Sequence, residues 1–330
     1  MSYTSQSVCS ARTSLKSVKE LVELLGYQRN DDGLSVEGRQ GCYFWYDFKD
    51  YRSWVGVELD IYKAKGGPVT VSTRSRAGRS YWDLTQQNKT LRSIRDLLGG
   101  HFETDAGRNR FWHPDESPPR PVSSGCFLAR WRFNNAIIKP RLYLMQRGFD
   151  QPNAKPELSG ISFIDEMNPR LFSNNLLLPY LVAIWEDYFK ASFTAMLRYS
   201  AQRENALKRA RLSQDRLEMV AAGTSSIEEV LAESLSFQRP SVVASNFKLI
   251  DPKFDLGACL KKPYRRRKIA LFDTIESYVE SRNEFVHTGR IDMRFTDKAV
   301  EKTLKDFVIA VDRCYDSFGA HYDFVPIRSY

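Results

Sequence analysis

The segment SRNEFVHTGR, residues 281–290, brings together Arg282, Asn283 and His287 in a chain that holds only four histidines. A Thr-Gly pair follows His287, which predicts that this histidine lies in the last turn of a helix ending at Gly289. The negative end of the helix dipole favours an imidazolium there by about 0.3–1 kcal/mol. A charged imidazole near neutral pH can act as a general acid, and the neutral form as a base. The segment could therefore supply proton transfer beside a fixed positive charge.

The helix that must position these residues is predicted over residues 268–289. Its apolar residues fall on one arc at 100° per residue: Phe272, Ile275, Val279 and Val286. Arg282 lies in the middle of this arc, where an unpaired guanidinium would cost several kcal/mol to desolvate. Arg282 should therefore pair with a carboxylate or face a polar cleft or an interface. Asn283 and His287 are four residues apart and within mutual reach. The alternative is an ordinary helix end, with His287 as a cap, Asn283 on the surface and Arg282 in a salt bridge.

The composition is that of a folded protein with a basic balance. The 330 residues are 42% hydrophobic and 27% charged, and the formal net charge is +9. A basic chain favours an acidic partner, of which nucleic acid is the commonest, although a mildly basic soluble protein has the same composition. The length favours two domains.

The cysteines and the apolar runs indicate in which compartment the protein is expected. Five cysteines are scattered along the chain without a C-x-x-C pair, which disfavours a disulfide framework or a Cys-rich zinc site and fits a reducing cytosol. The longest strongly apolar run, residues 176–185, is too short to span a bilayer. The N-terminus lacks an apolar signal region and is interpreted as a frayed polar tail. We expect a soluble, cytoplasmic protein that does not enter the membrane.

The first half of the chain has a mixed pattern. Helices are predicted at residues 14–26 and 81–100, and residues 117–125 are predicted to form a loop. Five runs rich in aromatic and β-branched residues predict strands at 41–48, 53–64, 67–76, 126–133 and 141–149. Gly66-Gly67-Pro68 predicts a hairpin turn between the second and third of these strands. Residues 150–160, with two prolines and a glycine, are the best candidate for a linker.

The second half has helical periodicity nearly throughout. Helices are predicted at 181–212, 225–237, 268–289 and 297–319, and Ser225 with Glu228 predicts a capping box for the second of them. The fold class is therefore an α+β protein of two domains. A mixed α/β domain covers residues 1–160, and an all-helical bundle covers residues 161–330.

Arg-Asn-x-x-x-His, late in a bundle helix and followed by one more helix, resembles the HEPN superfamily. The resemblance covers about residues 170–325 and includes the opening helix with IWEDYFKASF, residues 184–193, and the R-x4-H spacing from Arg282 to His287. The Asn directly after the Arg is typical of its ribonuclease members. Some HEPN toxins carry a tyrosine two residues after the histidine, where a partner nucleotidyltransferase modifies them. Gly289 stands at that position here, so this antitoxin arrangement is not expected.

The resemblance implies an HEPN-like bundle with metal-independent endoribonuclease activity and no cofactor. It also implies a role as a toxin or as an effector of antiviral abortive infection that cleaves tRNA or mRNA. Cleavage without a metal needs a base for the 2′-OH, an acid for the leaving oxygen and a cation for the phosphorane. His287 would be base or acid, Arg282 the phosphorane clamp, and Asn283 would orient the imidazole or a phosphate oxygen. One motif per chain implies a homodimer that meets along the motif helices. The mixed domain would be a regulator or sensor of a phage-derived trigger.

Two further groups of residues accompany the motif. Glu186 or Asp187 is predicted as a partner that supports Arg282 from the first bundle helix; both could equally be plain surface acids. The basic segment KKPYRRRK precedes the motif helix and could bind RNA phosphates, while its tyrosine stacks on a base, or could be a solvated loop. Its candidate RNA-binding residues are Lys261, Lys262, Tyr264, Arg265, Arg266, Arg267 and Lys268.

Two other functions remain open at this point. One is an HEPN-like module that binds RNA or a nucleotide without cutting it, in which His287 has no catalytic role. The other is a metal-dependent nuclease in the first half, built from Asp47, Glu58, Asp60 and Lys63. Restriction-nuclease folds use Asp or Glu, one residue and then Lys on a strand, whereas Asp60 and Lys63 are separated by two residues.

Overall fold

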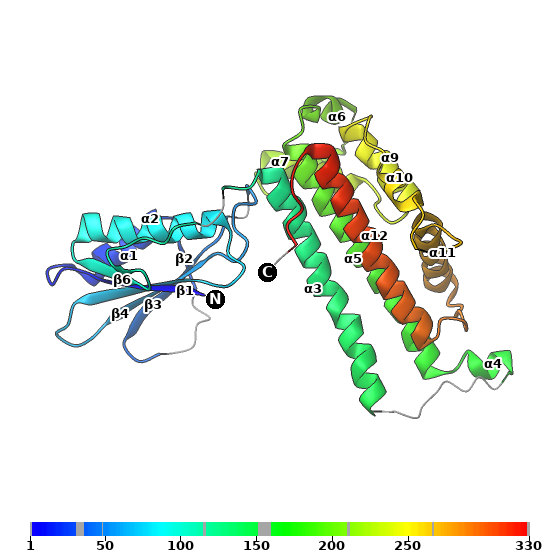
Figure 1. Cartoon of the computed structure of the whole chain (residues 1–330), viewed down its shortest axis with the longest axis horizontal. Coiled ribbons are helices and arrows are strands. Elements are labelled where there is room, and N and C mark those ends of the chain that lie inside the picture. The colour runs from blue at the N-terminus through cyan, green and yellow to red at the C-terminus, as the bar shows by residue number, and fades with distance from the viewer. Residues whose placement is uncertain are drawn as a thin grey trace. The chain divides into compact units, whose positions relative to one another are not determined.

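The chain divides into two compact units, and the division falls before the predicted linker. The computed structural model describes residues 2–30, 36–47, 49–114, 117–150, 160–209, 212–265 and 267–328. One unit comprises Met1–Ser124 with Arg328–Tyr330, and the other comprises Gly125–Ile327 (Figure 1). The predicted boundary at residue 160 is thus displaced to residue 124. Most of the predicted linker, residues 151–159, lies outside the described residues.

The first unit is built on an antiparallel sheet of seven strands in the order β2-β3-β4-β5-β1-β6-β7. The strands are β1 (Tyr3–Val8), β2 (Gln28–Arg29), β3 (Arg39–Trp45), β4 (Val57–Lys63), β5 (Val69–Ser75), β6 (His101–Thr104) and β7 (Gly107–Arg108). The hairpin predicted at Gly66-Gly67-Pro68 is confirmed, because β4 and β5 pair in antiparallel register from Glu58↔Arg74 to Lys63↔Val69. Gly66 in its turn has φ 77°, which favours glycine.

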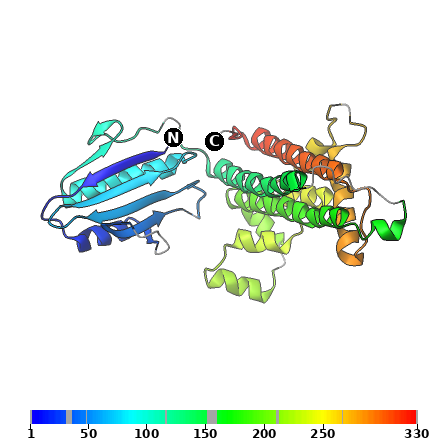
Figure 2. The ribbon, with the colours of Figure 1, turned by 90° about the horizontal axis from the view of Figure 1, so that it is seen from below.

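Two helices cover one face of this sheet, α1 (Leu15–Leu24) and α2 (Tyr81–Leu98), as Figures 1 and 2 show. Residues of β4 and β5 alternate between the covered and the open face, as a half-buried sheet requires. The core beneath the helices holds Val18, Val22, Tyr43, Leu59, Ile61, Val71 and Ile94. The α/β part of the predicted fold class is therefore confirmed.

The N-terminal segment is an interior strand of the sheet and not the predicted polar tail. β1 lies between β5 and β6, and its Ser5 and Ser7 face the core. Gln87 on α2 donates from Nε2 to the carbonyl oxygen of Tyr3 (3.2 Å) and to Ser5 Oγ (3.4 Å), and Ser75 Oγ donates to Gln87 Oε1 (2.8 Å). Because the inward side chains are serine hydroxyls, of which Ser5 bonds to the buried amide of Gln87, the strand lacks the apolar alternation that reveals other strands.

Asp83 fixes the start of α2 against the chain before β4. Its buried carboxylate accepts backbone N–H groups from Trp54 (3.1 Å), Val55 (3.2 Å) and Gly56 (3.2 Å), and from Ser80 (2.9 Å) within a capping box. This one side chain therefore joins two segments of the unit.

Replacing Asp83 with alanine is expected to lower the free energy of unfolding of this unit by about 2–4 kcal/mol, because buried donors lose a charged acceptor. Urea unfolding followed by circular dichroism measures the change. Thr85→Ala, at an exposed position on the same helix, is the matched control and should stay within about 0.5 kcal/mol of the wild type. Equal urea midpoints for the two variants would contradict the role given to Asp83.

The second unit is helical throughout the part that the structure describes. Its helices are α3 (Pro121–Asp150), α4 (Ser162–Asp165), α5 (Pro169–Arg198), α6 (Arg203–Arg209), α7 (Gln214–Ala221), α8 (Ile227–Ser234), α9 (Pro240–Ile250), α10 (Leu256–Lys261), α11 (Leu271–Thr288) and α12 (Asp297–Tyr322). The long helices α3, α5 and α12 run side by side (Figures 1 and 2). Buried rings join α5 to α9 and α12: Trp185 to Phe307 (5.5 Å), Phe193 to Phe247 (5.6 Å) and Phe247 to Phe318 (5.1 Å).

The prediction of a loop and two strands within residues 117–149 was wrong, because α3 occupies most of that segment. Its buried residues recur every three or four positions: Cys126, Ala129, Phe133, Ile137 and Pro140. Pro140 has no N–H for the carbonyl of Ala136, and Tyr180 on α5 supplies the missing donor, with its hydroxyl 3.0 Å from that oxygen. A contact from another helix thus lets α3 continue through a proline.

Two other helical predictions need correction. The helix predicted over 181–212 starts earlier and ends at Arg198, where the Oγ of Ser200 accepts the backbone N–H of Gln202 and a turn leads into α6. The capping box of α8 is formed by Ser226 and Glu229, one position after the predicted pair. Glu228 is instead buried and lies 2.6 Å from Arg203 Nε.

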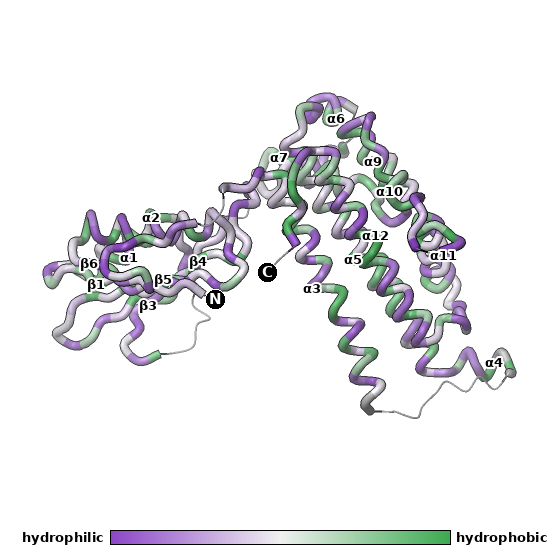
Figure 3. Tube along the Cα trace, in the orientation of Figure 1, coloured by the Kyte–Doolittle hydropathy of each residue, from purple (hydrophilic) through white to green (hydrophobic). Residues whose placement is uncertain are grey.

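None of the described helices is both long enough and apolar enough to cross a membrane. Figure 3 shows hydrophilic and hydrophobic residues in alternation along α3 and α12.

Candidate active site

The motif helix α11 forms and ends at Gly289 as predicted, but it begins at Leu271, three residues after the predicted start. Ile275 and Val279 are buried, and Gly289 takes the left-handed conformation at φ 72° with its N–H 2.9 Å from the carbonyl oxygen of Phe285. Val286, predicted on the apolar arc, is 49% exposed. The arc is therefore buried along the first part of the helix and open to solvent at the motif.

Arg282 is half-buried, and the described residues offer it no carboxylate. Its Nη1 donates to Asn283 Oδ1 (2.9 Å). Its Nε is shielded from solvent without an acceptor in the part of the chain that the structure describes. Other partly buried arginines of the bundle have carboxylate partners, such as Arg130 with Asp312 and Arg203 with Glu228. Arg147, which pairs with Asp297, also has a shielded Nε without an acceptor within the described residues, so Arg282 differs from the structural arginines in its lack of a carboxylate there.

His287 is exposed in the last turn of α11, beside the carbonyl end of the helix. Within the described residues its imidazole has neither a hydrogen bond nor an ion pair, so both ring nitrogens are open to a ligand. Asn283 is one helical turn earlier, but its amide oxygen accepts from Arg282. Asn283 thus orients the guanidinium in this structure, and the predicted contact with the imidazole is not formed.

Glu186 and Asp187 have partners other than Arg282. Glu186 Oε1 accepts the backbone N–H of Phe237 at 3.5 Å, and Asp187 Oδ2 lies 3.7 Å from Arg132 Nε. The structure therefore does not bring these two acids to Arg282. The aromatic residues of the same stretch, Trp185, Tyr188 and Phe189, are fully buried in the core of the bundle.

The basic segment contains one arginine with a structural role. Arg267 forms an ion pair with the fully buried carboxylate of Asp306, which also accepts the hydroxyl of Tyr278 at 2.9 Å. Arg267 therefore fixes the segment to α12 and is removed from the predicted RNA-binding set. Arg266 lies outside the described residues.

The remaining residues of the segment are open to solvent. Lys262 and Lys268 are exposed, and Lys261 Nζ lies 4.6 Å from the ring centre of Phe272. The ring of Tyr264 has the guanidinium groups of Arg265 (5.3 Å) and Arg313 (5.8 Å) beside it. Arg313 comes from α12, and no pattern in the sequence associates it with this segment.

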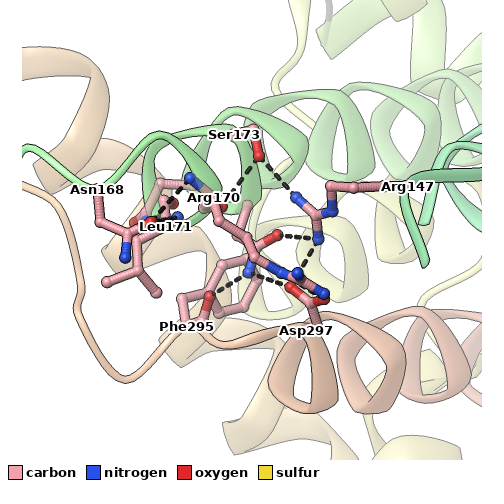
Figure 4. Close-up of polar contacts among 9 residues, drawn as sticks. Arg147, Asn168, Arg170, Leu171, Ser173, Phe295 and Asp297 are labelled. Carbon is pink, nitrogen blue, oxygen red and sulfur yellow. Dashed lines mark hydrogen bonds and ion pairs between the residues drawn. The ribbon is translucent and has the colours of Figure 1, made fainter. Parts of the chain in front are cut away.

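A polar network that the sequence did not reveal fixes the connection between α11 and α12 (Figure 4). Asp297, in the first turn of α12, accepts Arg147 Nη2 (2.6 Å), Arg170 Nε (2.9 Å) and Asn174 Nδ2 (3.0 Å). Arg147 also donates to Ser173 Oγ (2.7 Å). The network joins the end of α3 and the start of α5 to the start of α12.

A neighbouring asparagine holds the same connection from the side of the motif. Asn175 Oδ1 accepts the backbone N–H of Asp292 (3.0 Å), and its Nδ2 donates to the carbonyl oxygen of Asp292 (3.2 Å). Phe172 on α5 contacts Phe285 on α11, with ring centres 6.2 Å apart. The chain on both sides of His287 is therefore anchored to α5, although His287 itself has no hydrogen bond or ion pair with the described residues.

Acid is expected to weaken the bundle through Asp297. Burial alone would raise the pKa of Asp297, but hydrogen bonds from Arg170 and Asn174 and the charges of Arg147 and Arg170 lower it below the ordinary value. A carboxyl with a lowered folded pKa stabilises the protein above its unfolded pKa of about 3.9, and that stability is lost as the pH falls through the folded pKa.

We expect the urea midpoint of the bundle to fall as the pH drops below about 4, and Asp297→Asn to make this fall shallower. Urea unfolding at a series of pH values measures both. Asp251, whose pKa is lowered by its hydrogen bond with His321, should preserve part of the acid dependence in the variant. Identical acid dependence in wild type and Asp297→Asn would contradict this assignment.

The residues of the alternative metal-nuclease site do not form one. Asp60 pairs with Arg39 (3.3 Å) and Glu58 with Arg76 (2.5 Å) on the open face of β4. Lys63 is three positions from Asp60, so it belongs to the opposite face of the strand. Asp47 accepts backbone N–H groups of its own loop. Within the described residues, no three His, Cys, Asp or Glu side chains gather where they could hold a metal ion.

Comparisons of the chain with protein-family models, with curated proteins and with solved structures find no match.

Proposed function

We propose that the chain is a metal-independent endoribonuclease of the HEPN type, with Arg282, Asn283 and His287 as its catalytic residues. The observation that supports this most is the state of Arg282, whose half-buried guanidinium has no carboxylate partner, and whose shielded Nε has no acceptor, among the described residues. A phosphate oxygen would supply that acceptor, and the planar fork of arginine suits two such oxygens. A helix end with only a structural purpose would gain stability from an apolar residue at this position.

The proposed reaction needs no group beyond the RNA and the motif. A base removes the proton from a ribose 2′-OH, and the oxygen forms a bond to the adjacent phosphorus. Arg282 stabilises the charge of the resulting phosphorane, with Asn283 holding its guanidinium. The bond to the 5′-oxygen breaks, and an acid protonates the leaving oxygen. The products are a 2′,3′-cyclic phosphate and a 5′-hydroxyl.

The reaction needs one group as the general base and another as the general acid, whereas each chain has a single His287. A homodimer that meets along α11 supplies the second histidine. Apolar side chains exposed beside the motif support this arrangement: Val286 is 49%, Phe172 47% and Leu176 49% exposed. Phe172 packs against Phe285, so these apolar residues lie next to the motif and could be covered by a second copy.

RNA binding is proposed for the exposed part of the basic segment. Lys261, Lys262, Arg265 and Lys268 would contact phosphates, and Tyr264 would stack on a base. Arg313 joins this group because it lies against Tyr264. Arg267 is excluded by its ion pair with Asp306.

The test uses the purified full chain with total RNA and tRNA in excess EDTA, followed by mapping of the product ends. We expect cleavage with 2′,3′-cyclic phosphate ends. Intact RNA, both with EDTA and with magnesium, in a preparation that binds RNA would favour the second candidate, a binding module that does not cut. The basic group around Tyr264 is the observation that keeps this second candidate open. A role in antiviral abortive infection or as a toxin, with the sheet unit as the sensor, is proposed from the HEPN resemblance alone.

A further inference from the structure

Two buried thiols meet between α10 and α12. The sulfur atoms of Cys259 and Cys314 are 3.7 Å apart. Cys314 is fully buried, and Cys259 is 8% exposed. All five cysteines of the chain are free thiols in this structure. Neither thiol takes part in the proposed reaction.

The two thiols differ in chemical character. Cys259 donates its S–H to the carbonyl oxygen of Leu256 (3.0 Å), so the S–H of Cys314 is left to donate to the sulfur of Cys259. This hydrogen bond lowers the pKa of Cys259 against the opposing effect of burial, and the charges of Arg313 and Lys262 lower it further. Burial raises the pKa of Cys314 well above its ordinary value. Cys259 is therefore the better nucleophile, and it is also the thiol nearer to solvent.

We propose that Cys259 and Cys314 form an oxidation site, at which a small peroxide oxidises Cys259 and Cys314 then closes an intramolecular disulfide. In the first step the Cys259 thiolate attacks hydrogen peroxide: an S–O bond forms, the O–O bond breaks, and the departing oxygen is protonated to water. In the second step the sulfur of Cys314 attacks the sulfenic acid: an S–S bond forms, the S–O bond breaks, and a second water leaves. Two thiols and one peroxide thus give one disulfide and two waters.

The local structure can accommodate the bond. The sulfur atoms must close to about 2.05 Å. Cys259 lies near the end of α10, a short helix with non-helical chain on both sides, so the backbone can shift there. The end of α10 is already tied to α12 next to Cys314, because Arg313 Nη1 donates to the carbonyl oxygen of Lys262 (3.0 Å).

The disulfide would enclose the whole segment between α10 and α12. That segment contains the basic residues around Tyr264 and the motif helix α11. Oxidation would therefore fix the position of the basic segment relative to α12. The site stands on the contact of the two thiols and does not depend on the proposed ribonuclease activity.

The first test uses the reduced wild-type chain, freed of reductant and treated with hydrogen peroxide while folded. Remaining thiols are blocked with N-ethylmaleimide in denaturant, and the digested peptides are identified by mass spectrometry. We expect a peptide that links Cys259 to Cys314, with Cys126, a fully buried cysteine, still alkylated. Absence of this peptide, or its formation only together with links to other cysteines, would overturn the proposal.

Single variants test the assigned order of reaction. In Cys314→Ser, peroxide should leave Cys259 as a sulfenic acid that dimedone labels, whereas Cys259→Ser should give no label at Cys314. Labelling of Cys314 in Cys259→Ser to the same extent would overturn the assignment of Cys259 as the attacking thiol. If either variant fails to fold, the linked peptide of the wild type still decides whether the site exists.

Discussion

Replacing His287 with alanine is expected to lower the rate of RNA cleavage about 10²–10⁴-fold, because the reaction loses its proton-transfer group. The side chain is exposed and makes no hydrogen bond within the described residues, so folding and RNA affinity should remain as in the wild type. Cleavage in EDTA and RNA binding are measured on the same preparation. His113→Ala, at another exposed histidine, is the matched control and should cut normally. Unchanged cleavage by His287→Ala would exclude a catalytic role.

Replacing Arg282 is expected to affect the cleavage activity without lowering the stability of the protein. Arg282→Leu is expected to abolish cleavage yet leave the free energy of unfolding unchanged or raise it by about 1 kcal/mol, because it removes a shielded N–H that has no acceptor in the described part of the chain. Arg267→Leu is the opposite case, since it leaves the buried Asp306 without its cation and should destabilise the bundle. If Arg282→Leu destabilises as much as Arg267→Leu does, Arg282 is a structural arginine and the proposal loses its main support.

Removing the carboxylate of Asp306 is expected to lower the free energy of unfolding of the bundle by about 3–5 kcal/mol. Asp306 is fully buried on α12, and it is the partner of both Arg267 and the hydroxyl of Tyr278. In Asp306→Ala the guanidinium and the hydroxyl both lose their acceptor, while a cavity opens beside them. Urea unfolding followed by far-UV circular dichroism, which reports helix content, measures the loss.

The control for Asp306 is Glu301→Ala, which removes an exposed carboxylate from the same helix and should change stability by about 0.5 kcal/mol or less. Asp306→Asn should fall between the two, because the amide oxygen can still accept one hydrogen bond. Equal unfolding midpoints for Asp306→Ala and Glu301→Ala would show that the ion pair does not hold the basic segment on α12.

Local patterns were sufficient for the elements whose stabilising contacts lie close in sequence. The hairpin between β4 and β5 follows from two strand runs around a glycine turn, and the end of α11 follows from Gly289. Both depend on backbone conformation within a few residues, which the residue types themselves favour. The position of Arg282, Asn283 and His287 on one helix end was predictable for the same reason.

Patterns failed where a distant residue supplies what a segment lacks. β1 has hydroxyls on its inward face, and Ser5 finds its hydrogen-bond partners in Gln87 of α2 and Thr73 of β5. α3 contains a proline, and only Tyr180 of α5 satisfies the carbonyl that this proline leaves unbonded. Neither segment shows its partner in its own sequence, so each was assigned to the wrong kind of structure.

The sequence by itself determined the helical periodicity of the second half, the glycine that ends α11 and the residue types of the motif. Only the tertiary structure decided which charged side chains are neutralised by ion pairs and which could bind a ligand. Asp306 forms an ion pair with Arg267 of the basic segment, and Asp297 forms ion pairs with Arg147 and Arg170 from two other helices. Arg282, in contrast, has no carboxylate partner within the described residues. The physical reason is that an ion pair depends on proximity in space, and Arg147 is 150 positions from Asp297 in the chain.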